Sequence, residues 1–339
     1  MLKNKSLKIA VSGSLAYDQI MNFPGCFGDH ILPDQIHNLN VSFFLGGLKV
    51  SFGGTAGNIA YNLGLLGVRP TIFGVVGEDF SSYETWLKKR KIDLSRVKKM
   101  TGEKTAAAYI ITDRKDNQIT AFYPGPLPKN YVRPLVAGFK NIAWAIISPD
   151  DKARMLDYAA MYQQKRIPYI FDPGQALIAF SPAELKKALS GAQILIGNDY
   201  EIKLAQNKLG IDLKTLIKTV EILVITKGGE GSEIYQRGDK VKKIIVPAAR
   251  PKNTCDPTGA GDAYRAGFIK GLLSGGDLKT CGQLAGLVAV YTVEKFGTQT
   301  HSFTLAGLKK RYYENYRERL TVLKEKAPDA DGTAQGSFS

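Results

Sequence analysis

Short apolar runs alternate with amphipathic segments along most of the chain, and this alternation constrains the fold more than any other feature. The runs are β-branched or almost continuously apolar, as expected of parallel strands covered on both faces. The pattern predicts an α/β fold: a central, mostly parallel sheet with helices on both faces. The predicted strands are Lys8–Gly13, Thr71–Val76, Ile142–Ser148, Pro168–Phe171, Gln193–Ile196 and Leu223–Thr226.

Amphipathic segments between and after these runs predict the helices. One helix start is well marked, because Ser181-Pro182-Ala183-Glu184 combines a capping box with proline at the first helical position. The predicted helices are Tyr83–Lys91, Asp151–Lys165, Ala183–Leu189, Ala260–Leu273, Leu278–Phe296 and Leu305–Leu323.

Two segments interrupt the alternation, Asn22–Leu48 and Thr101–Tyr123, which are richer in strand-like patterns and turn residues. Inserted into an α/β core, they would pair as a small sheet that covers a ligand. The alternative is a pair of surface excursions without function. The predicted organisation is one domain over residues 1–325, with lid segments at about 19–51 and 101–125, followed by a flexible polar tail at 327–339.

The chain carries a formal net charge of +15, which fits either a nucleic-acid binder or a basic surface that attracts an anionic nucleotide. The basic residues are dispersed and accompany no Arg-rich or aromatic-basic motif. This dispersion favours the solvated surface and makes nucleic acid an unlikely partner.

Composition also bears on the compartment. The three cysteines are widely spaced and lack metal-ligand spacing, which favours a reducing, intracellular location. The apolar run Leu7–Val11 is too short for a signal peptide, and the uncharged stretch Val50–Val68 is too rich in glycine and asparagine for a membrane span. We therefore predict a soluble, cytoplasmic protein with no membrane partner.

The most informative motif is Asp256–Asp262, which reads Asp-Pro-Thr-Gly-Ala-Gly-Asp before the apolar helix Ala263–Leu273. Glycines at a helix entrance let unpaired backbone N–H groups face a concavity, and with the helix dipole they form an anion site. The helix terminus favours an ionised Asp262, whose carboxylate can accept a proton from a hydroxyl that attacks a phosphoryl group. The alternative is a glycine-rich turn in which Asp262 only stabilises the helix.

Other nucleotide-binding motifs are missing. The sequence contains no Gly-x-x-x-x-Gly-Lys-Ser/Thr, and the first strand is followed by Gly13–Asp18 without a Gly-x-Gly-x-x-Gly. A P-loop or a dinucleotide-binding Rossmann domain is therefore disfavoured.

Two further features belong to the N-terminal part. The string Gly53–Asn58 precedes an apolar helix, where glycines permit close approach to a ligand and Asn58 offers a donor and an acceptor. A turn with an Asn cap is the alternative. Asp18 lies beyond the first strand, where open α/β sheets bind ligands, so its carboxylate could hold vicinal hydroxyls. A solvated turn aspartate is the alternative.

Two features follow later strands. Asn198 and Glu201 lie one helical turn apart, and such a pair can hold the waters around a phosphate-bound magnesium ion. A helix N-cap with a first-turn glutamate is the alternative. Thr226–Gly229 ends the next strand and could pass under a nucleotide, or form a simple hairpin turn.

Taken together, these strings resemble the ribokinase (PfkB) family in order and spacing over about residues 8–325. The glycine string that ends at Asn58 looks like that family's N-terminal motif, and Asp256–Asp262 looks like its C-terminal motif, with proline where many members have threonine or another small residue. Asn198 and Glu201 match its Asn-x-x-Glu. The resemblance implies a ribokinase-like fold with a β-lid that often forms a homodimer contact.

The resemblance also implies roles for individual residues. Asp262 would be the catalytic base, with an anion hole formed by the amides of Gly259, Ala260 and Gly261. The remaining implied roles are substrate binding by Asp18, Gly54 and Asn58, ATP binding by Asn198, Thr226 and Gly228, a water-mediated Mg²⁺ contact at Glu201, and a monovalent-cation (K⁺) site at Asp256.

Within the family the likeness is to bacterial adenosine kinases, carried by strings such as Phe122–Gly125, Asp172–Gln175 and Asp262–Gly267. In that branch Phe122 and Gln175 would contact the purine, and Ser42 would reach the same pocket. Phe122 packed in a core is the alternative. The chain departs from adenosine-specific members at Ala108, where we expect an aromatic residue.

The sequence thus predicts an ATP-dependent phosphotransferase acting on the 5′-hydroxyl of a nucleoside, most readily adenosine. The first alternative is a kinase for a free sugar such as ribose or fructose. The second is a non-catalytic module that binds nucleotide or nucleic acid.

Overall fold

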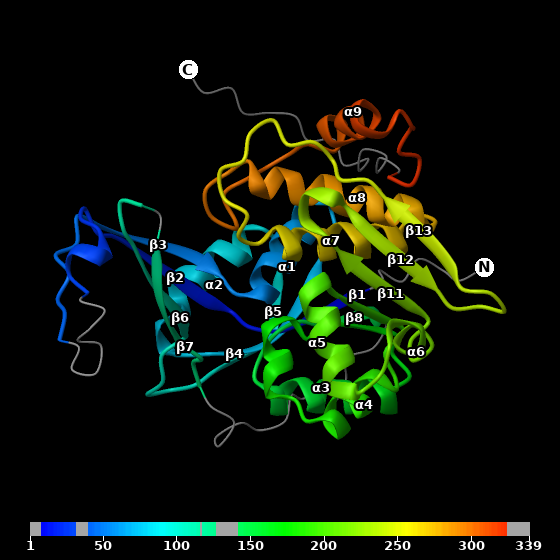
Figure 1. Cartoon of the computed structure of the whole chain (residues 1–339), viewed down its shortest axis with the longest axis horizontal. Coiled ribbons are helices and arrows are strands. Elements are labelled where there is room, and N and C mark those ends of the chain that lie inside the picture. Colours follow the sequence, from blue (N-terminus) through cyan, green and yellow to red (C-terminus); the bar gives the residue numbers. More distant parts are fainter. Residues whose placement is uncertain (1–7, 32–39, 116, 127–141, 324–339) are drawn as a thin grey trace, which may run out of the picture.

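The computed structural model describes residues 8–31, 40–115, 117–126 and 142–323. The tail predicted at 327–339 lies outside these residues. Figure 1 shows a large α/β body from which a small sheet projects at one end.

A nine-stranded sheet forms the centre of the body. Its strands, in spatial order, are β13 (Lys242–Val246), β12 (Ser232–Gln236), β11 (Ile222–Thr226), β10 (Ile194–Asn198), β9 (Tyr169–Phe171), β8 (Ile142–Ile147), β1 (Lys8–Ser12), β4 (Pro70–Val76) and β5 (Asp93–Lys99).

The seven strands from β11 to β5 run parallel, and β12, which pairs antiparallel with both β11 and β13, is the one strand of this described sheet that runs in the opposite direction. The predicted mostly parallel sheet is therefore confirmed. The six strands predicted in the body are all present, whereas β5, β12 and β13 were not predicted. These three lie at the edges, where polar residues replace the continuous apolar runs of buried parallel strands.

Helices cover both faces of this sheet (Figure 1). One face carries α1 (Thr55–Leu65), α2 (Ser81–Lys89), α7 (Ala260–Leu273) and α8 (Leu278–Val293), with α9 (Leu305–Tyr316) outside α8. The other face carries α3 (Lys152–Gln164), α4 (Pro182–Leu189), α5 (Asp199–Leu209) and α6 (Leu213–Ile217).

Alternate residues of each central strand supply the two cores. In β1, Ile9 and Val11 pack beneath α1 and α7, whereas Ala10 packs on the opposite side with Tyr158 of α3. All of these side chains are buried, which explains why the strand reads as an unbroken apolar run.

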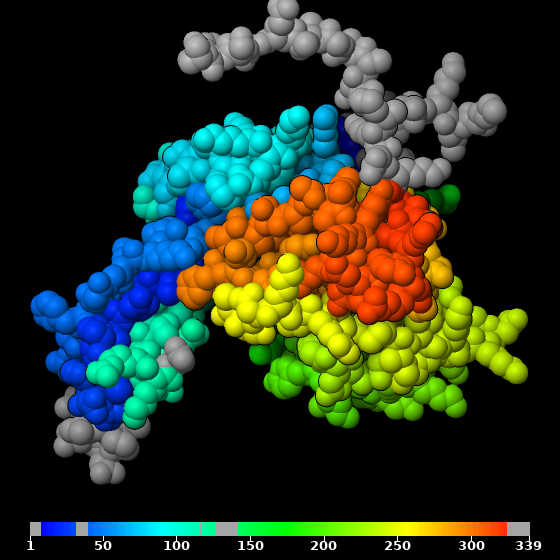
Figure 2. Space-filling view, turned by 90° about the horizontal axis from the view of Figure 1, so that it is seen from above, coloured from blue at the N-terminus to red at the C-terminus, as the bar shows by residue number. Residues whose placement is uncertain are grey.

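A separate four-stranded sheet has the order β3-β2-β6-β7. Its strands are β2 (Ala16–Asn22), β3 (Gly47–Gly53), β6 (Ala106–Thr112) and β7 (Gln118–Tyr123). The segment Thr101–Tyr123 supplies β6 and β7 as predicted, but β2 and β3 flank Asn22–Leu48 instead of lying within it. In the space-filling view this sheet stands away from the body and leaves an open notch beside it (Figure 2).

Several predicted boundaries need correction. The last helix was expected to reach Leu323, but α9 ends at Tyr316 because Arg317 adopts a left-handed conformation with φ of 56°. Helix α8 stops at Val293, three residues before the predicted end at Phe296. The capping box at Ser181 is confirmed, with both of its hydrogen bonds present.

Candidate active site

Two glycine-rich turns bring the first turns of α1 and α7 together. Gly54 precedes α1 with φ of 81°, and Gly259 precedes α7 with φ of 77°. Only glycine adopts this backbone geometry readily. The Asn58 amide then donates to Asp262 Oδ2 at 2.8 Å, which joins the two turns.

The entrance of α7 presents free backbone amides. Within the described part of the chain, the N–H groups of Gly259 and Gly261 have no acceptor, and no side chain caps the helix. The N–H of Ala260 differs from the prediction, because it closes a turn on the carbonyl of Pro257 at 3.1 Å. Two of the three predicted anion-hole amides are therefore available to a ligand.

The Asp262 carboxyl lies in a desolvated and acidic environment. Burial raises its pKa to about 6, and the nearby Asp18 and Glu201 carboxylates add to that rise. Arg265 and the Asn58 hydrogen bond act in the opposite direction. We expected the helix terminus to favour the ionised form of Asp262, but burial is the largest influence on its pKa and acts in the opposite direction. A pKa near 6 still leaves Asp262 mostly ionised at neutral pH, as a general base requires.

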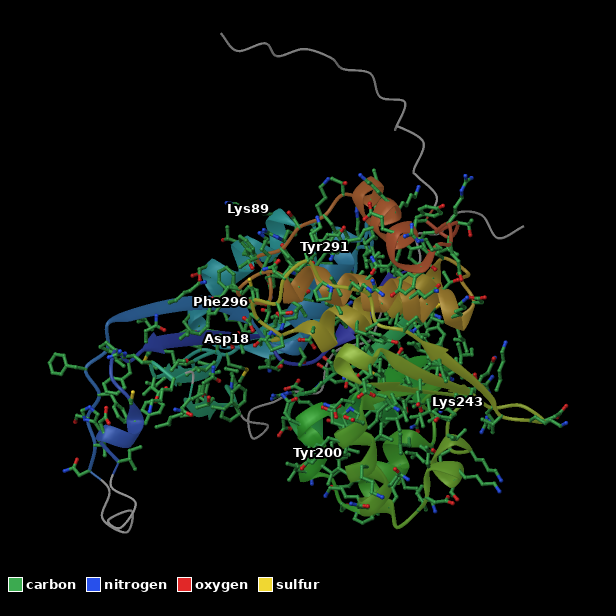
Figure 3. The ribbon with its side chains drawn as sticks, turned by 45° about the horizontal axis from the view of Figure 1, so that its top comes forward. Asp18, Lys89, Tyr200, Lys243, Tyr291 and Phe296 are labelled. Carbon is green, nitrogen blue, oxygen red and sulfur yellow. The ribbon has the colours of Figure 1, made fainter. Side chains whose placement is uncertain are left out.

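Asp18 lies inside strand β2 rather than in a turn, which corrects the alternative of a solvated turn aspartate. Burial raises the pKa of its carboxyl to about 6, with a further contribution from Asp256. A Cβ on Gly53 would lie 2.4 Å from Asp18 Oδ2, so glycine at 53 makes room for this carboxylate. Figure 3 places Asp18 where the small sheet meets the body, close to Phe296.

One row of residues crosses the small sheet at the level of Asp18. Asp18 pairs with Ser51 of β3 and with Ala108 of β6, and Ala108 pairs with Phe122 of β7. Paired residues point to the same face of a sheet, so all four side chains lie on the face that carries Asp18. The Phe122 ring is 58% exposed and is therefore not a core residue.

A pocket of about 420 Å³ lies on the other side of the α7 entrance. Predicted residues from two motifs line it, namely Thr226 and Gly228 from the end of β11 and Ala260 and Gly261 from α7. Most of the remaining wall is apolar and comes from β13, the segment that follows it, and α8. An apolar pocket of this size beside free amides can hold a flat heterocycle and its phosphates.

Asn198 and Glu201 form a reciprocal helix cap at the start of α5. Asn198 Oδ1 accepts from the Glu201 amide at 2.7 Å, and Glu201 Oε2 accepts from the Asn198 amide at 2.8 Å. Asn198 does not line the 420 Å³ pocket. The capping alternative is therefore present, and of these two side chains only Glu201 Oε1 and Asn198 Nδ2 remain for a ligand.

Asp256 links the turn before α7 to the loop after α8. Its Oδ1 accepts from the Thr258 amide and its Oδ2 from the Gly297 amide, both at 2.9 Å. In the parts of the chain that the structure describes, no three His, Cys, Asp or Glu side chains cluster closely enough to hold a metal ion.

Ser42 and Gln175, which were predicted to contact the base, are both surface residues. Ser42 is exposed in the loop before β3. Gln175 is exposed in a short 3₁₀ helix, Gly174–Ala179, that follows β9.

A buried ion pair anchors that 3₁₀ segment to α7, and sequence reasoning gave it no role. Arg265 Nη2 donates to Asp172 Oδ1 at 2.5 Å, and both side chains are almost fully buried. Burial lowers the pKa of Arg265, but the Asp172 carboxylate outweighs it, so the net shift is upward. Breaking such a pair leaves an uncompensated buried charge.

A second network behind the site was also missed, because its members lie far apart in the sequence. Gln299 contacts Asn58, Tyr83 and Trp86 through hydrogen bonds of 2.6–3.0 Å. Gly57 belongs to the same arrangement, since a Cβ there would lie 1.9 Å from Tyr83 Oη. No local sequence motif predicts that Gln299 makes these hydrogen bonds.

No helix within the described ranges is both long and apolar enough to cross a membrane.

Comparisons with known proteins agree with this geometry. The model of the pfkB family carbohydrate kinases matches residues 12–304. A nucleoside kinase of Methanocaldococcus jannaschii is 33% identical over 299 residues, covering 88% of this chain and 94% of the relative. The Burkholderia thailandensis nucleoside kinase, solved in complex with inosine, has a TM-score of 0.82 at 35% identity, covering 92% of this chain and 99% of that one. A structure of the M. jannaschii enzyme gives a TM-score of 0.80 at 31% identity, covering 92% and 100%. The chain therefore belongs to the pfkB family of carbohydrate kinases, and it is a kinase.

Proposed function

We propose that this kinase transfers the γ-phosphate of ATP to the 5′-hydroxyl of a nucleoside. The observation that carries the proposal is the position of Asp262, which lies beside free amides and the apolar pocket and close enough to Asp18 for the two carboxylates to interact. The names of the similar proteins support a nucleoside over a free sugar.

The proposed path of the phosphoryl group follows from the relative positions of the pocket, the free amides, Asp262 and Asp18. ATP occupies the 420 Å³ pocket, with its phosphates toward the amides of Gly259 and Gly261. The hydroxyl, held near Asp18, loses its proton to Asp262 as it attacks in line. The fixed amides stabilise the charge that develops on the phosphoryl oxygens.

The row Ser51–Asp18–Ala108–Phe122 suggests how a nucleoside lies on the small sheet. Strands are about 4.8 Å apart, so Asp18 and Phe122 lie about 10 Å from each other across the row. That span suits a ribose at Asp18 and a base against the Phe122 ring, with the small Ala108 between them. Gln175 and Ser42 remain proposed contacts to the base, and adenosine remains the first candidate.

The residues present also fit two cations. Mg²⁺ supplies charge neutralisation between nucleotide phosphates and keeps most of its waters, so Glu201 Oε1 would hold one of those waters. Asp256 already orders the loop at Gly297, where backbone carbonyls and this carboxylate would together bind K⁺.

A homodimer through the lid is the remaining part of the proposal. The face of the small sheet opposite Asp18 exposes the apolar side chains of Leu48, Val50, Tyr109 and Ile119. Exposed apolar patches of this kind commonly mark protein interfaces. Light scattering of the wild type and of Val50→Lys should show a dimer and a monomer, respectively.

A substrate panel with coupled ADP detection tests the function. We expect turnover with adenosine, inosine or guanosine and little with D-ribose or D-fructose. Turnover restricted to free sugars would establish the sugar-kinase alternative, and an absence of ADP formation with every acceptor would favour the non-catalytic module.

Ala108→Leu provides a structural test of nucleoside placement within the same panel, since it enlarges the side chain without adding the aromatic ring expected in adenosine-specific members. The larger side chain should raise KM for purine nucleosides by at least about tenfold, because it fills the space between ribose and base. The rate of D-ribose turnover should stay at the wild-type value. Equal losses for both acceptors would argue against a base lying over residue 108.

A further inference from the structure

Gln299 is a buried amide in the loop after α8, and it is only 3% exposed. Its Nε2 donates to Asn58 Oδ1 at 3.0 Å and to Tyr83 Oη at 2.6 Å. Its Oε1 accepts from the indole N–H of Trp86 at 3.0 Å. A side chain with this many hydrogen bonds in a buried position is held in one orientation.

The chemistry of the bonded groups fixes the direction of each hydrogen bond in the network around Gln299. The Trp86 indole can only donate, so the oxygen of Gln299 must face it and the nitrogen must face Asn58 and Tyr83. Asn58 therefore receives through Oδ1 and turns its NH₂ group to Asp262 Oδ2, 2.8 Å away. On the second branch, the Tyr83 hydroxyl donates to the Gly53 carbonyl at 2.9 Å, which can only accept.

We propose that Gln299 is a positioning residue for phosphoryl transfer, which acts through Asn58 on the catalytic carboxylate. It holds the Asn58 amide so that Asp262 Oδ2 always receives a hydrogen bond. The other oxygen, Oδ1, accepts no hydrogen bond from any described residue and is free to take the proton of the substrate hydroxyl. This inference rests on the proposed role of Asp262 as the base.

The physical reason is the polarity of an amide. Without Gln299, Asn58 can rotate about its last bond and present its carbonyl to Asp262. A carbonyl beside a buried carboxylate disfavours the ionised form, whereas an N–H donor favours it. The side chain of Asp262 is already desolvated and faces other carboxylates, so this one donor has a large effect on how easily the base ionises.

Gln299→Met tests the inference, because methionine keeps the volume and removes both hydrogen-bonding ends. We expect the acidic limb of the pH profile of kcat/KM to move upward by about one pH unit, the usual effect of losing a hydrogen bond to a charged group. Activity should fall about fivefold near pH 6, approach a loss of about tenfold near pH 5, and recover toward the wild-type value near pH 9. Trp86→Phe removes only the distant donor and should move the limb in the same direction by less.

Gln283→Met is the matched control. Gln283 is also buried, at 2% exposure, and accepts a hydrogen bond from Tyr312, but it has no bond to the Gln299 network. This control should lose stability without moving the pH limb. A ¹³C NMR titration of the Asp262 carboxyl in free wild type and Gln299→Met gives the same comparison without turnover.

An equal loss of activity at all pH values, or an equal shift in Gln283→Met, would reduce Gln299 to a core residue and overturn the inference. Asp262→Asn separates this failure from a failure of the proposed function. If Asp262→Asn is inactive while Gln299→Met shows no shift, only the positioning role is wrong. If Asp262→Asn is fully active, the base assignment and the positioning role both fall.

Discussion

Asn58 Nδ2 lies 2.8 Å from Asp262 Oδ2, although 204 residues separate the two in the sequence. The sequence predicted Asn58 as a ligand for sugar hydroxyls, and that role remains a proposal. In the structure its amide is committed to the carboxylate, and the Asn58 side chain is only 5% exposed. The contact makes the glycine-rich turns before α1 and α7 parts of one hydrogen-bonded unit.

Asp262→Asn should lower kcat by about two to four orders of magnitude, the usual contribution of a positioned general base. The change keeps the shape of the side chain but removes its ability to accept the proton. Single-turnover assays with saturating ATP and nucleoside measure the effect. Circular dichroism and ATP binding should match the wild type, and turnover near the wild-type rate in such a folded variant would contradict the assignment.

The pH dependence of kcat/KM should show an acidic limb near pH 6, because burial raises the pKa of both Asp262 and Asp18 to about 6. Both carboxylates must be ionised for their proposed roles, so the limb should be steeper than a single titration. The measurement is kcat/KM between pH 5 and 9 at constant ionic strength. A profile flat down to pH 5 would show that neither group controls the reaction.

The raised pKa values of Asp262 and Asp18 also predict that, as the pH is lowered, activity falls before the protein unfolds. A carboxyl whose folded pKa lies above 3.8 adds stability that is complete below pH 3.8 and disappears as the pH rises through 6. Protonation of Asp18 and Asp262 therefore favours the folded chain. Thermal melts at pH 5.5 should accordingly retain a cooperative transition where turnover is already reduced, and activity should return on neutralisation.

Gly57→Ala should damage both stability and activity. The new Cβ would lie 1.9 Å from Tyr83 Oη, and moving that ring disturbs Gln299 and Asn58. Overpacking of this kind costs about 1–3 kcal/mol. Denaturant unfolding and kcat/KM are the measurements.

Gly64→Ala in the same helix is the control for that change. The nearest atom to its Cβ is the Arg90 carbonyl oxygen at 3.8 Å, so the methyl group fits. Alanine is about 1 kcal/mol more favourable than glycine within a helix. Gly64→Ala should therefore equal or exceed the wild-type stability, and equal effects at both positions would refute the steric explanation.

His301 should make the fold sensitive to acid. Burial lowers its pKa from 6.5 to about 4, so its contribution to stability is present above pH 6.5 and is lost as the pH falls through 4. At about 1.36 kcal/mol per pKa unit, the difference is worth about 3 kcal/mol. Unfolding free energies of wild type and His301→Gln should converge between pH 6.5 and 4, while the exposed His30→Gln control should keep the wild-type dependence.

Much of the fold could be predicted because the central strands are buried on both faces and their sequences are continuously apolar. The position of Asp262 in the first turn of a helix could also be predicted, since it follows the glycine-rich string Gly259-Ala260-Gly261, whereas its role as the base stays a prediction. Glycines with positive φ, such as Gly54 and Gly259, leave a local signal of this kind.

The network behind the site left no such signal. Gln299, Trp86 and Tyr83 look like ordinary residues of a loop and a helix, and only tertiary packing brings them to Asn58. The Arg265–Asp172 ion pair could not be predicted either, because 93 residues separate the two side chains in the sequence. The hydrogen bond that closes Ala260 onto Pro257 depends on the shape of one turn, which composition does not specify.

The small sheet enters and leaves the body twice, through β2 and β3 before α1 and through β6 and β7 between β5 and β8. Apart from Asp18, the row Ser51–Asp18–Ala108–Phe122 adds no residue to the entrance of α7 or to the lining of the 420 Å³ pocket. Under the proposed placement of the nucleoside, mutations at Ser51, Ala108 or Phe122 should alter which acceptor is phosphorylated and leave the rate of phosphoryl transfer to a bound acceptor unchanged. Because the small sheet and the α7 entrance are separate parts of the fold, substitutions in the sheet could change the preferred acceptor without altering the residues around Asp262.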